Sequence, residues 1–278
     1  MHDSGMHEEG VSRKMLNERG VALLIALLVT TLLIALVFEF AYGTRVSLRV
    51  AVNFRDGQRA VCLARSGVNF AGKLLSENLK SGKAQANLEQ REWQVVPMIS
   101  EGDTALRVRW EDEGGKINIA NVTSGQPSLA RLERLFGAKG VDLDALDRIH
   151  EQKNIRLVTQ LHRYLSDEEF GKIREFVTVY GSDKIDVNTA PGAVLESLGA
   201  SPSLASLIVE RRNQEPFDTK EKVVNFPGMD ATTAGTLDIT GNVFFVQSFA
   251  TVGGYTRQVD AVIKRDTTGY AVLYWRSL

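Results

Sequence analysis

The sequence has almost no cysteine: Cys62 stands alone among 278 residues. A single thiol excludes an intrachain disulfide and a zinc site built from cysteines. Because no second cysteine or paired histidine supports reactive chemistry, we expect Cys62 to be a small buried apolar residue. The net charge is only −1, from 33 basic and 34 acidic residues. The chain therefore lacks the global positive charge that is typical of avid nucleic-acid-binding proteins.

Motifs for catalysis and metal binding are missing as well. There is no Gly-x-Ser-x-Gly sequence and no P-loop. The four histidines have no metal-ligand spacing: His2, His7, His150 and His162. Three aspartates, Asp142, Asp144 and Asp147, are close together, but a calcium site needs about six oxygen ligands and a glycine-bearing loop. We read these aspartates as solvated residues near a helix N-terminus, and we predict neither an enzyme nor a metal site.

One stretch contains no charge at all. Residues 21–38 (VALLIALLVTTLLIALVF) would form a helix about 27 Å long, close to the ~30 Å hydrocarbon core of a bilayer. A buried soluble helix of this length would carry a polar stripe, and a secretory signal peptide would be followed by a small-residue cleavage site. Neither is present. The sequence therefore predicts a retained single transmembrane segment, residues 21–42.

The flanking charges do not orient this segment. Three basic residues precede it and four follow it within the next 21 residues, so counting positive charges favours neither direction. They are Arg13, Lys14 and Arg19 before the segment, and Arg45, Arg49, Arg55 and Arg59 after it. The second group lies on a helix face that is solvated or that contacts lipid headgroups or neighbouring subunits.

A long helix is predicted to continue beyond the membrane. Residues 39–80 contain no proline, and their apolar residues recur at helical spacing. We expect this helix to end near Ser81 and Gly82.

Strands are predicted at both ends of the remaining chain, where apolar and polar residues alternate and turn residues separate the runs. They are residues 92–98, 104–111, 242–251, 256–265 and 270–276. Because the pattern between the two groups is helical, we expect one antiparallel sheet interrupted by an insertion. Residues 55–80 are expected to cover one face of that sheet. The predicted fold class is α+β.

The expected insertion, residues 116–237, contains an internal echo. The run Gly-Lys-Ile-Asn-Ile-Ala at 115–120 is similar to Asp-Lys-Ile-Asp-Val-Asn at 183–188, and each run precedes a helical block. This suggests two related helical units. In the second unit Thr189 can cap a helix whose first turn contains Pro191, and residues 202–212 form the next helix. That layout resembles the helix-hairpin-helix pair of DNA-repair and competence proteins.

DNA binding by such hairpins depends on backbone amides of a glycine-rich turn and on basic side chains. Here the first hairpin has lost its second glycine, and Pro202 offers no amide hydrogen. The second hairpin places Asp230 where a phosphate would approach. Residues 184–235 hold five basic and seven acidic residues, a net charge of −2. We therefore expect a protein-contact module and no nucleic acid, with DNA binding as the rival hypothesis.

The N-terminal residues carry a resemblance to a known class of proteins. Residues 1–20 form a polar leader that ends in Gly20 directly before the apolar segment, and this resembles the signal of type IV pilin-like proteins. The resemblance implies that a prepilin peptidase cleaves after Gly20 on the cytoplasmic side and methylates the new amino terminus, Val21. Most pilins carry Glu at the fifth mature position, where this chain has Ile25. Because a carboxylate in lipid is costly without a partner, its absence points to a filament-tip subunit.

Taken together, these features resemble the type II secretion system minor pseudopilin K family. They are Gly20 before an apolar helix without a Glu at 25, Lys116–Ile119, Phe176–Val179, the run Lys184–Pro191, and three closing strands. The resemblance implies a pilin-like α/β domain interrupted by an all-α, SAM-like or helix-hairpin-helix-like domain. The domains would be a leader (1–20), a transmembrane segment (21–42), a first part of the pilin-like domain (43–115), the insertion (116–237) and the closing strands (238–278).

The same resemblance implies a function. Such a protein sits at the tip of the periplasmic pseudopilus and primes filament assembly with I- and J-like minor pseudopilins, for export of folded proteins across the outer membrane. It is a single-pass protein of the bacterial inner membrane with its C-terminal bulk in the periplasm. No cofactor is expected, and calcium is suggested by the resemblance alone. The alternatives are a type IV pilus minor pilin and a membrane-anchored DNA-uptake protein.

Overall fold

The computed structural model describes residues 6–83, 90–96, 99, 102–120, 127–151 and 155–278. Residues 1–5 of the expected leader and residues 97–98 of the first expected strand lie outside the described residues. The chain divides into two compact units, Met1–Asp56 and Gly57–Leu278.

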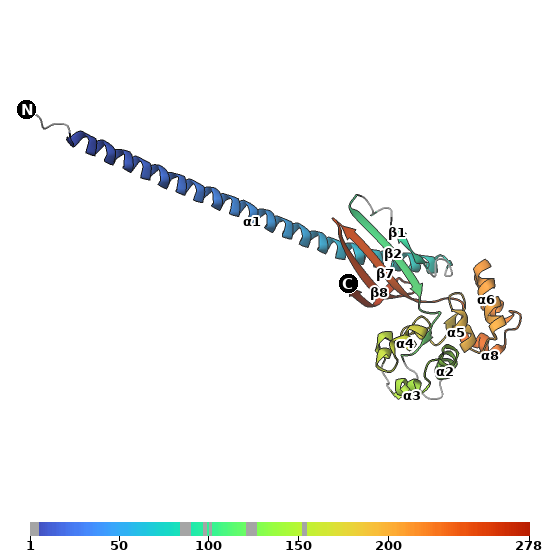
Figure 1. Ribbon diagram of the computed structural model, residues 1–278. Coiled ribbons are helices and arrows are strands. Elements are labelled where there is room, and N and C mark those ends of the chain that lie inside the picture. Colours follow the sequence, from blue (N-terminus) through green and yellow to red (C-terminus); the bar gives the residue numbers. More distant parts are fainter. Residues whose placement is uncertain (1–5, 84–89, 97–98, 100–101, 121–126, 152–154) are drawn as a thin grey trace, which may run out of the picture. The chain divides into compact units, whose positions relative to one another are not determined.

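A single long helix, α1 (Met6–Lys80), begins the chain (Figure 1). It ends as the sequence predicts, and the turn that follows contains Gly82 with a φ of +70°. In the first unit, the apolar side chains from Val21 to Phe38 are exposed. Within the described part of the chain, α1 is the one helix long and apolar enough to cross a membrane.

The second unit contains a five-stranded antiparallel sheet in the order β1-β2-β7-β8-β9. Its strands are β1 (Gln90–Val95), β2 (Thr104–Asp112), β7 (Val243–Val252), β8 (Tyr255–Arg265) and β9 (Tyr270–Ser277). The strand β2 pairs along its whole length with β7, although the insertion separates them in the sequence. The prediction of an antiparallel sheet interrupted by an insertion is therefore confirmed.

The last part of α1 covers one face of this sheet, as expected. Ala64, Val68, Ala71 and Leu75 are buried there together with inward-facing residues of β2, β7 and β8. Helix and sheet approach closely at two glycines of the helix. A Cβ atom on Gly67 would lie 2.9 Å from Cγ2 of Val108, and one on Gly72 would lie 2.6 Å from the ring of Tyr270.

The expectation that Cys62 is buried is wrong. Its side chain is exposed, because it points away from the sheet. On a helix with 100° per residue it stands about 160° from the buried Ala60.

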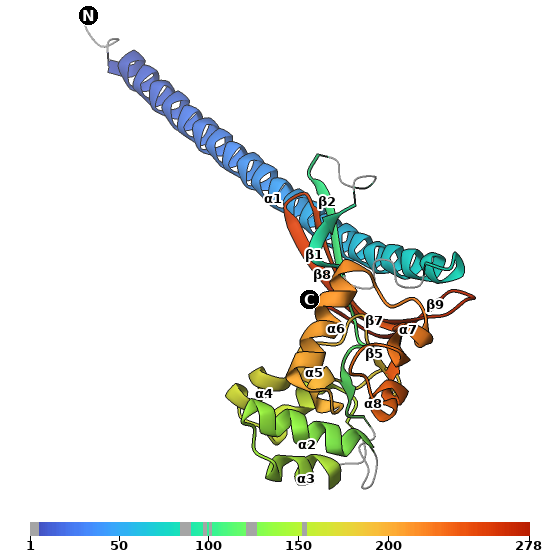
Figure 2. The same cartoon turned by 90° about the vertical axis from the view of Figure 1, so that its right-hand side faces the viewer.

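The insertion contains two groups of helices (Figure 2). The first group is α2 (Pro127–Lys139), α3 (Asp144–Glu151), the 3-10 helix η1 (Val158–Arg163) and α4 (Asp167–Ile173). The second group is α5 (Gly192–Ser197), α6 (Pro202–Gln214), α7 (Lys220–Val224) and α8 (Ala231–Thr236).

Each group is closed by a two-residue parallel strand pair. The first pair is β3 (Ile117–Asn118) with β4 (Val177–Thr178), and the second is β5 (Ile185–Asp186) with β6 (Leu237–Asp238). The insertion was expected to be entirely helical and is not, because the two echoing segments form strands. A hairpin-length sequence pattern cannot reveal a strand of two residues whose partner lies 60 residues away, as for Ile117 and Val177, or 52 residues away, as for Ile185 and Leu237.

The echo corresponds to equivalent local structure. In both segments the second strand residue accepts a hydrogen bond from the amide two residues later: Asn118 Oδ1 from Ala120 (2.9 Å) and Asp186 Oδ1 from Asn188 (2.9 Å). The first strand residues, Ile117 and Ile185, are both buried. The insertion therefore consists of two similarly built units.

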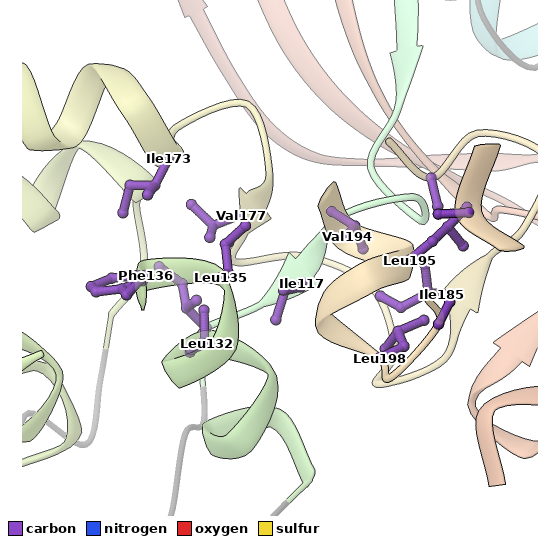
Figure 3. Close-up of a cluster of buried hydrophobic side chains, with 14 of the residues drawn as sticks. Ile117, Leu132, Leu135, Phe136, Ile173, Val177, Ile185, Val194, Leu195 and Leu198 are labelled. Atoms are coloured by element: carbon purple, nitrogen blue, oxygen red, sulfur yellow. The ribbon is translucent and has the colours of Figure 1, made fainter. Parts of the chain in front are cut away.

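One hydrophobic core joins the two helical units of the insertion. Figure 3 shows Ile117 of β3 between the side chains of α2, among them Leu132 and Leu135, and those of α5, among them Val194 and Leu198. Because α2 and α5 belong to different units, neither unit completes its core alone.

Candidate functional site at the junction of the sheet and the insertion

The chain leaves the sheet and returns to it at neighbouring points. The amide of Glu113 donates to the carbonyl of Val243 (2.8 Å), and the amide of Asp186 donates to the carbonyl of Gly114 (2.8 Å). Glycines make this close approach possible. A Cβ on Gly115 would lie 2.7 Å from Oγ1 of Thr189, and one on Gly241 would overlap the Asp112 carboxylate. The junction therefore brings together β2, β5 and the segment that precedes β7.

Residues 184–191, the run most typical of the suspected family, form the centre of this junction. Ile185, Val187 and Ala190 are fully buried. The side chain of Asn188 donates to the carbonyls of Phe217 (2.9 Å) and Ile239 (2.8 Å) and accepts from the amide of Phe217 (2.7 Å). One amide side chain thus connects β5 with the segments that precede α7 and follow β6.

The expectation that Thr189 caps a helix is wrong. The residue before α5 is Pro191, and no side chain caps that helix. Thr189 precedes this N-cap residue by two positions, and its hydroxyl instead donates to Oδ2 of Asp112 (2.7 Å). This bond links the insertion to the last residue of β2.

Two buried carboxyls meet at the junction, Asp112 of β2 and Asp186 of β5, each 1% exposed. Burial, followed by the charge of Asp186, raises the pKa of Asp112 well above its usual range, although bonds from Thr189 and the Gly114 amide act against this. Burial raises the pKa of Asp186 to about 6, and the amide of Asn188 opposes the shift. The two carboxyls titrate as a pair.

A buried arginine stands beside this pair. Arg265 of β8 is 1% exposed and donates through Nε (3.2 Å) and Nη2 (2.9 Å) to the carbonyl of Gly241. Its Nη1 donates to the carbonyl of Leu75 in α1 (3.1 Å). Burial lowers the pKa of Arg265, whereas the charges of Asp112 and Asp186 act in the opposite direction. Arg265 therefore joins α1, β8 and the returning segment at one point.

An open groove of about 750 Å³ lies next to the junction, between the sheet and the insertion. Its lining includes Lys116, whose ammonium contacts Glu113 (2.8 Å) and Glu111 (3.2 Å). Neither Asp112 nor Asp186 is among the lining residues. The carboxyl pair therefore does not line this groove, and its position suits a structural role.

The sequence-predicted site residues belong to a different part of the chain. Gly20, Val21 and Ile25 are exposed on α1 in the first compact unit, whereas the junction belongs to the second. Asp112 and Arg265 were not predicted. A signal for both exists: each continues the inward-facing alternation of its strand, Leu106-Val108-Trp110 in β2 and Val259-Ala261-Ile263 in β8.

Among the aspartates considered for calcium, Asp142 forms local bonds at the start of α3, and Asp144 and Asp147 lie in the first turn of that helix. Oδ1 of Asp142 accepts from the amide of Asp144 (3.0 Å), and its Oδ2 lies 3.7 Å from Nη2 of Arg148. Over the described residues, no group of three or more His, Cys, Asp or Glu side chains could hold a metal ion.

Two helical hairpins are present where the sequence predicts them, one between α5 and α6 and one between α7 and α8. Gly199 and Gly228 occupy their turns with φ of +111° and +82°. The helix N-termini that would face a phosphate are capped by the chain itself: Ser201 accepts from the Leu204 amide (3.2 Å), and Asp230 accepts from the Thr233 amide (2.9 Å). The second cap also places a negative charge there.

Comparison with known proteins bears on this junction directly. Residues 185–240 match the family model described as type II secretion system (T2SS), protein K. The resemblance to protein K is confirmed. The matched segment begins in β5 and ends just after β6, so it contains the second helical unit with Asp186, Asn188 and Thr189.

The fold is similar to a chain in the crystal structure of the GspK–GspI–GspJ complex of the type 2 secretion system of enterotoxigenic Escherichia coli. The TM-score is 0.61 at 12% sequence identity, over 83% of this chain and 99% of that chain. No curated protein sequence matches this one. The segment that matches the protein K model thus lies in a chain that shares its fold with a component of that complex, and this segment includes the junction residues 185–191.

Proposed function

We propose that this chain is a minor pseudopilin of a type II secretion system, located at the tip of the pseudopilus. The observation that carries the proposal is the protein K segment at residues 185–240, which forms half of a domain inserted into an interrupted antiparallel sheet. A bulky insertion is difficult to accommodate inside a packed helical filament and is acceptable at its end. On this proposal the chain primes assembly with I- and J-like pseudopilins and has no catalytic activity.

The apolar segment supports a location of this subunit in the inner membrane. Residues 21–42 would anchor it in the inner membrane, with the C-terminal bulk in the periplasm, because every described apolar side chain of Val21–Phe38 is exposed and requires an apolar surrounding. Ile25 would keep a carboxylate out of the lipid at a position where a tip subunit has no neighbour to pair with it.

Co-purification tests the proposal. The full chain, extracted in detergent from cells that also produce the I- and J-like pseudopilins of the same bacterium, is expected to retain both. A chain with a scrambled residue 185–240 segment serves as the control for non-specific capture. Failure of the intact chain to retain either partner, together with tight binding to duplex DNA, would reverse the proposal in favour of DNA uptake. Retention by pilus minor pilins alone would favour a type IV pilus.

A further inference from the structure

The insertion is attached to the sheet through two carboxyl groups that are both buried. Asp112 ends β2 in the sheet, and Asp186 ends β5 in the insertion. Two ionised carboxylates in contact away from water would repel each other and lose their hydration, and a buried pair avoids this cost by keeping one proton.

Their hydrogen bonds are unequal. Asp112 accepts from the Gly114 amide (2.9 Å) and the Thr189 hydroxyl (2.7 Å), so both of its oxygens have partners. Asp186 accepts from the Asn188 amide through Oδ1, while its Oδ2 is buried without a hydrogen-bond partner among the described residues. Asp112 lies within range to act on Asp186 as a hydrogen-bond donor when it carries the proton.

The other charged groups around the pair do not neutralise both carboxylates. Arg265 approaches from β8, but its guanidinium is already bonded to the carbonyls of Gly241 and Leu75. Asp238 approaches from β6 and adds a further negative charge, with Lys220 at 3.7 Å from it on the outer side. The buried arginine therefore offsets one of the negative charges, and a bound proton would neutralise a second one.

We propose that Asp112 and Asp186 form a proton-binding site that holds one proton between two carboxyls, and that this proton fastens the inserted domain to the sheet. The proton resides on Asp112, which donates a hydrogen bond to Asp186. The pKa of Asp112 is raised well above its usual range and that of Asp186 to about 6, in keeping with this arrangement.

The proposal fixes the sign of the pH dependence. Aspartates in the unfolded chain have a pKa of about 3.9, so from mild acid upward the folded protein binds more protons than the unfolded one. The stabilisation is therefore fully present in acid and is lost as the pH rises through about 6, the pKa of Asp186, and then through the higher pKa of Asp112. The unfolding equilibrium constant should rise by up to about tenfold per pH unit for each proton lost.

Asparagine at position 112 provides the sharpest test. Its amide oxygen can accept from Gly114, and its NH2 group, in the place of Oδ2, can donate to the Thr189 hydroxyl and to Asp186, yet it does not titrate. We would measure thermal unfolding of the full chain in detergent micelles from about pH 5 to about pH 9. Tryptophan fluorescence, to which Trp110 in β2 contributes, reports the transition.

The wild-type melting temperature is expected to fall throughout this range, whereas that of Asp112→Asn should be nearly level above about pH 7, where Asp186 is already ionised. The matched control is Asp103→Asn, an exposed aspartate in the same domain, which should keep the wild-type slope. A wild-type melting temperature that does not fall, or an Asp112→Asn variant with the wild-type slope, overturns the proposal.

A second measurement does not depend on any variant. The infrared C=O stretch of a protonated carboxyl should be visible in the wild-type chain at neutral pH, because the proton is held far above the ordinary pKa of aspartate. A spectrum that shows ionised carboxylates alone at neutral pH contradicts the proposal even if Asp112→Asn fails to fold.

Discussion

At the scale of single residues, the junction depends on a few polar side chains that have complete hydrogen-bonding arrangements inside the protein. Asn188 is the clearest example, because its amide group uses both donors and its acceptor on backbone groups of Phe217 and Ile239. Buried backbone groups that lose such a partner cannot turn to water, and each one costs about 1–3 kcal/mol.

We predict that Asn188→Ala lowers the free energy of unfolding by about 2–4 kcal/mol, since it leaves the Phe217 and Ile239 groups without partners. Urea unfolding followed by far-ultraviolet circular dichroism measures the change. Asn213→Ala is the matched control, because Asn213 is exposed on α6, and its effect should stay within about 0.5 kcal/mol. Equal losses from the two variants would contradict this account of Asn188.

At the scale of secondary structure elements, the contact between α1 and the sheet depends on helix positions that have small side chains or none. The helix residues that face β2 and β7 are small or moderate in size, and Gly67 lies directly against Val108 and Leu106. Glycine is unfavourable in a helix interior by about 1 kcal/mol relative to alanine. Here that cost is offset by close packing, which places the sheet against the helix backbone.

The substitution Gly67→Ala should therefore destabilise the protein by about 1–3 kcal/mol, because the added methyl group overpacks a contact that is already close. Gly137→Ala in α2 should do the opposite and stabilise by up to about 1 kcal/mol, since a Cβ there meets nothing within 4 Å. Thermal unfolding of both variants measures whether each substitution lowers or raises the stability. A stabilising Gly67→Ala would show that the helix does not pack this closely in solution.

At the scale of the whole molecule, the chain consists of two compact units with different surroundings. In the unit Met1–Asp56 the apolar side chains from Val21 to Phe54 are exposed, whereas the unit Gly57–Leu278 buries apolar side chains in two cores. The proposed tip function needs both. On that proposal, one unit would supply the anchor and the cleavage site, and the other would supply the folded bulk that meets the partners.

We predict that prepilin peptidase cleaves this chain after Gly20. Co-expression with the peptidase should give a mature chain that begins with a methylated Val21, as measured by N-terminal sequencing and intact mass. The variant Gly20→Val should remain uncleaved because a branched side chain replaces the glycine before the scissile bond, while Gly43→Val, in a helical stretch free of neighbouring atoms, serves as the control and should be cleaved normally. Any other mature N-terminus of the wild-type chain defeats the prediction.

Much of the fold could be predicted because it follows from local periodicity. The strand predicted at 104–111 is β2 (Thr104–Asp112), and the three predicted C-terminal strands match β7, β8 and β9 to within one residue at each end. The two-residue strands β3 to β6 could not be predicted, since their pairing joins positions that only the packed core brings together.

The sequence alone determined the apolar segment, the long helix and the interrupted sheet, because hydrophobic spacing and length are properties of consecutive residues. Tertiary structure alone decided the roles of the polar residues at the junction. Thr189 could have capped a helix, and Asp112 could have been an exposed strand end. Which groups an aspartate meets, and whether water reaches it, depends on segments that are distant in the chain. The proton that Asp112 and Asp186 share is a consequence of that meeting and of no local pattern.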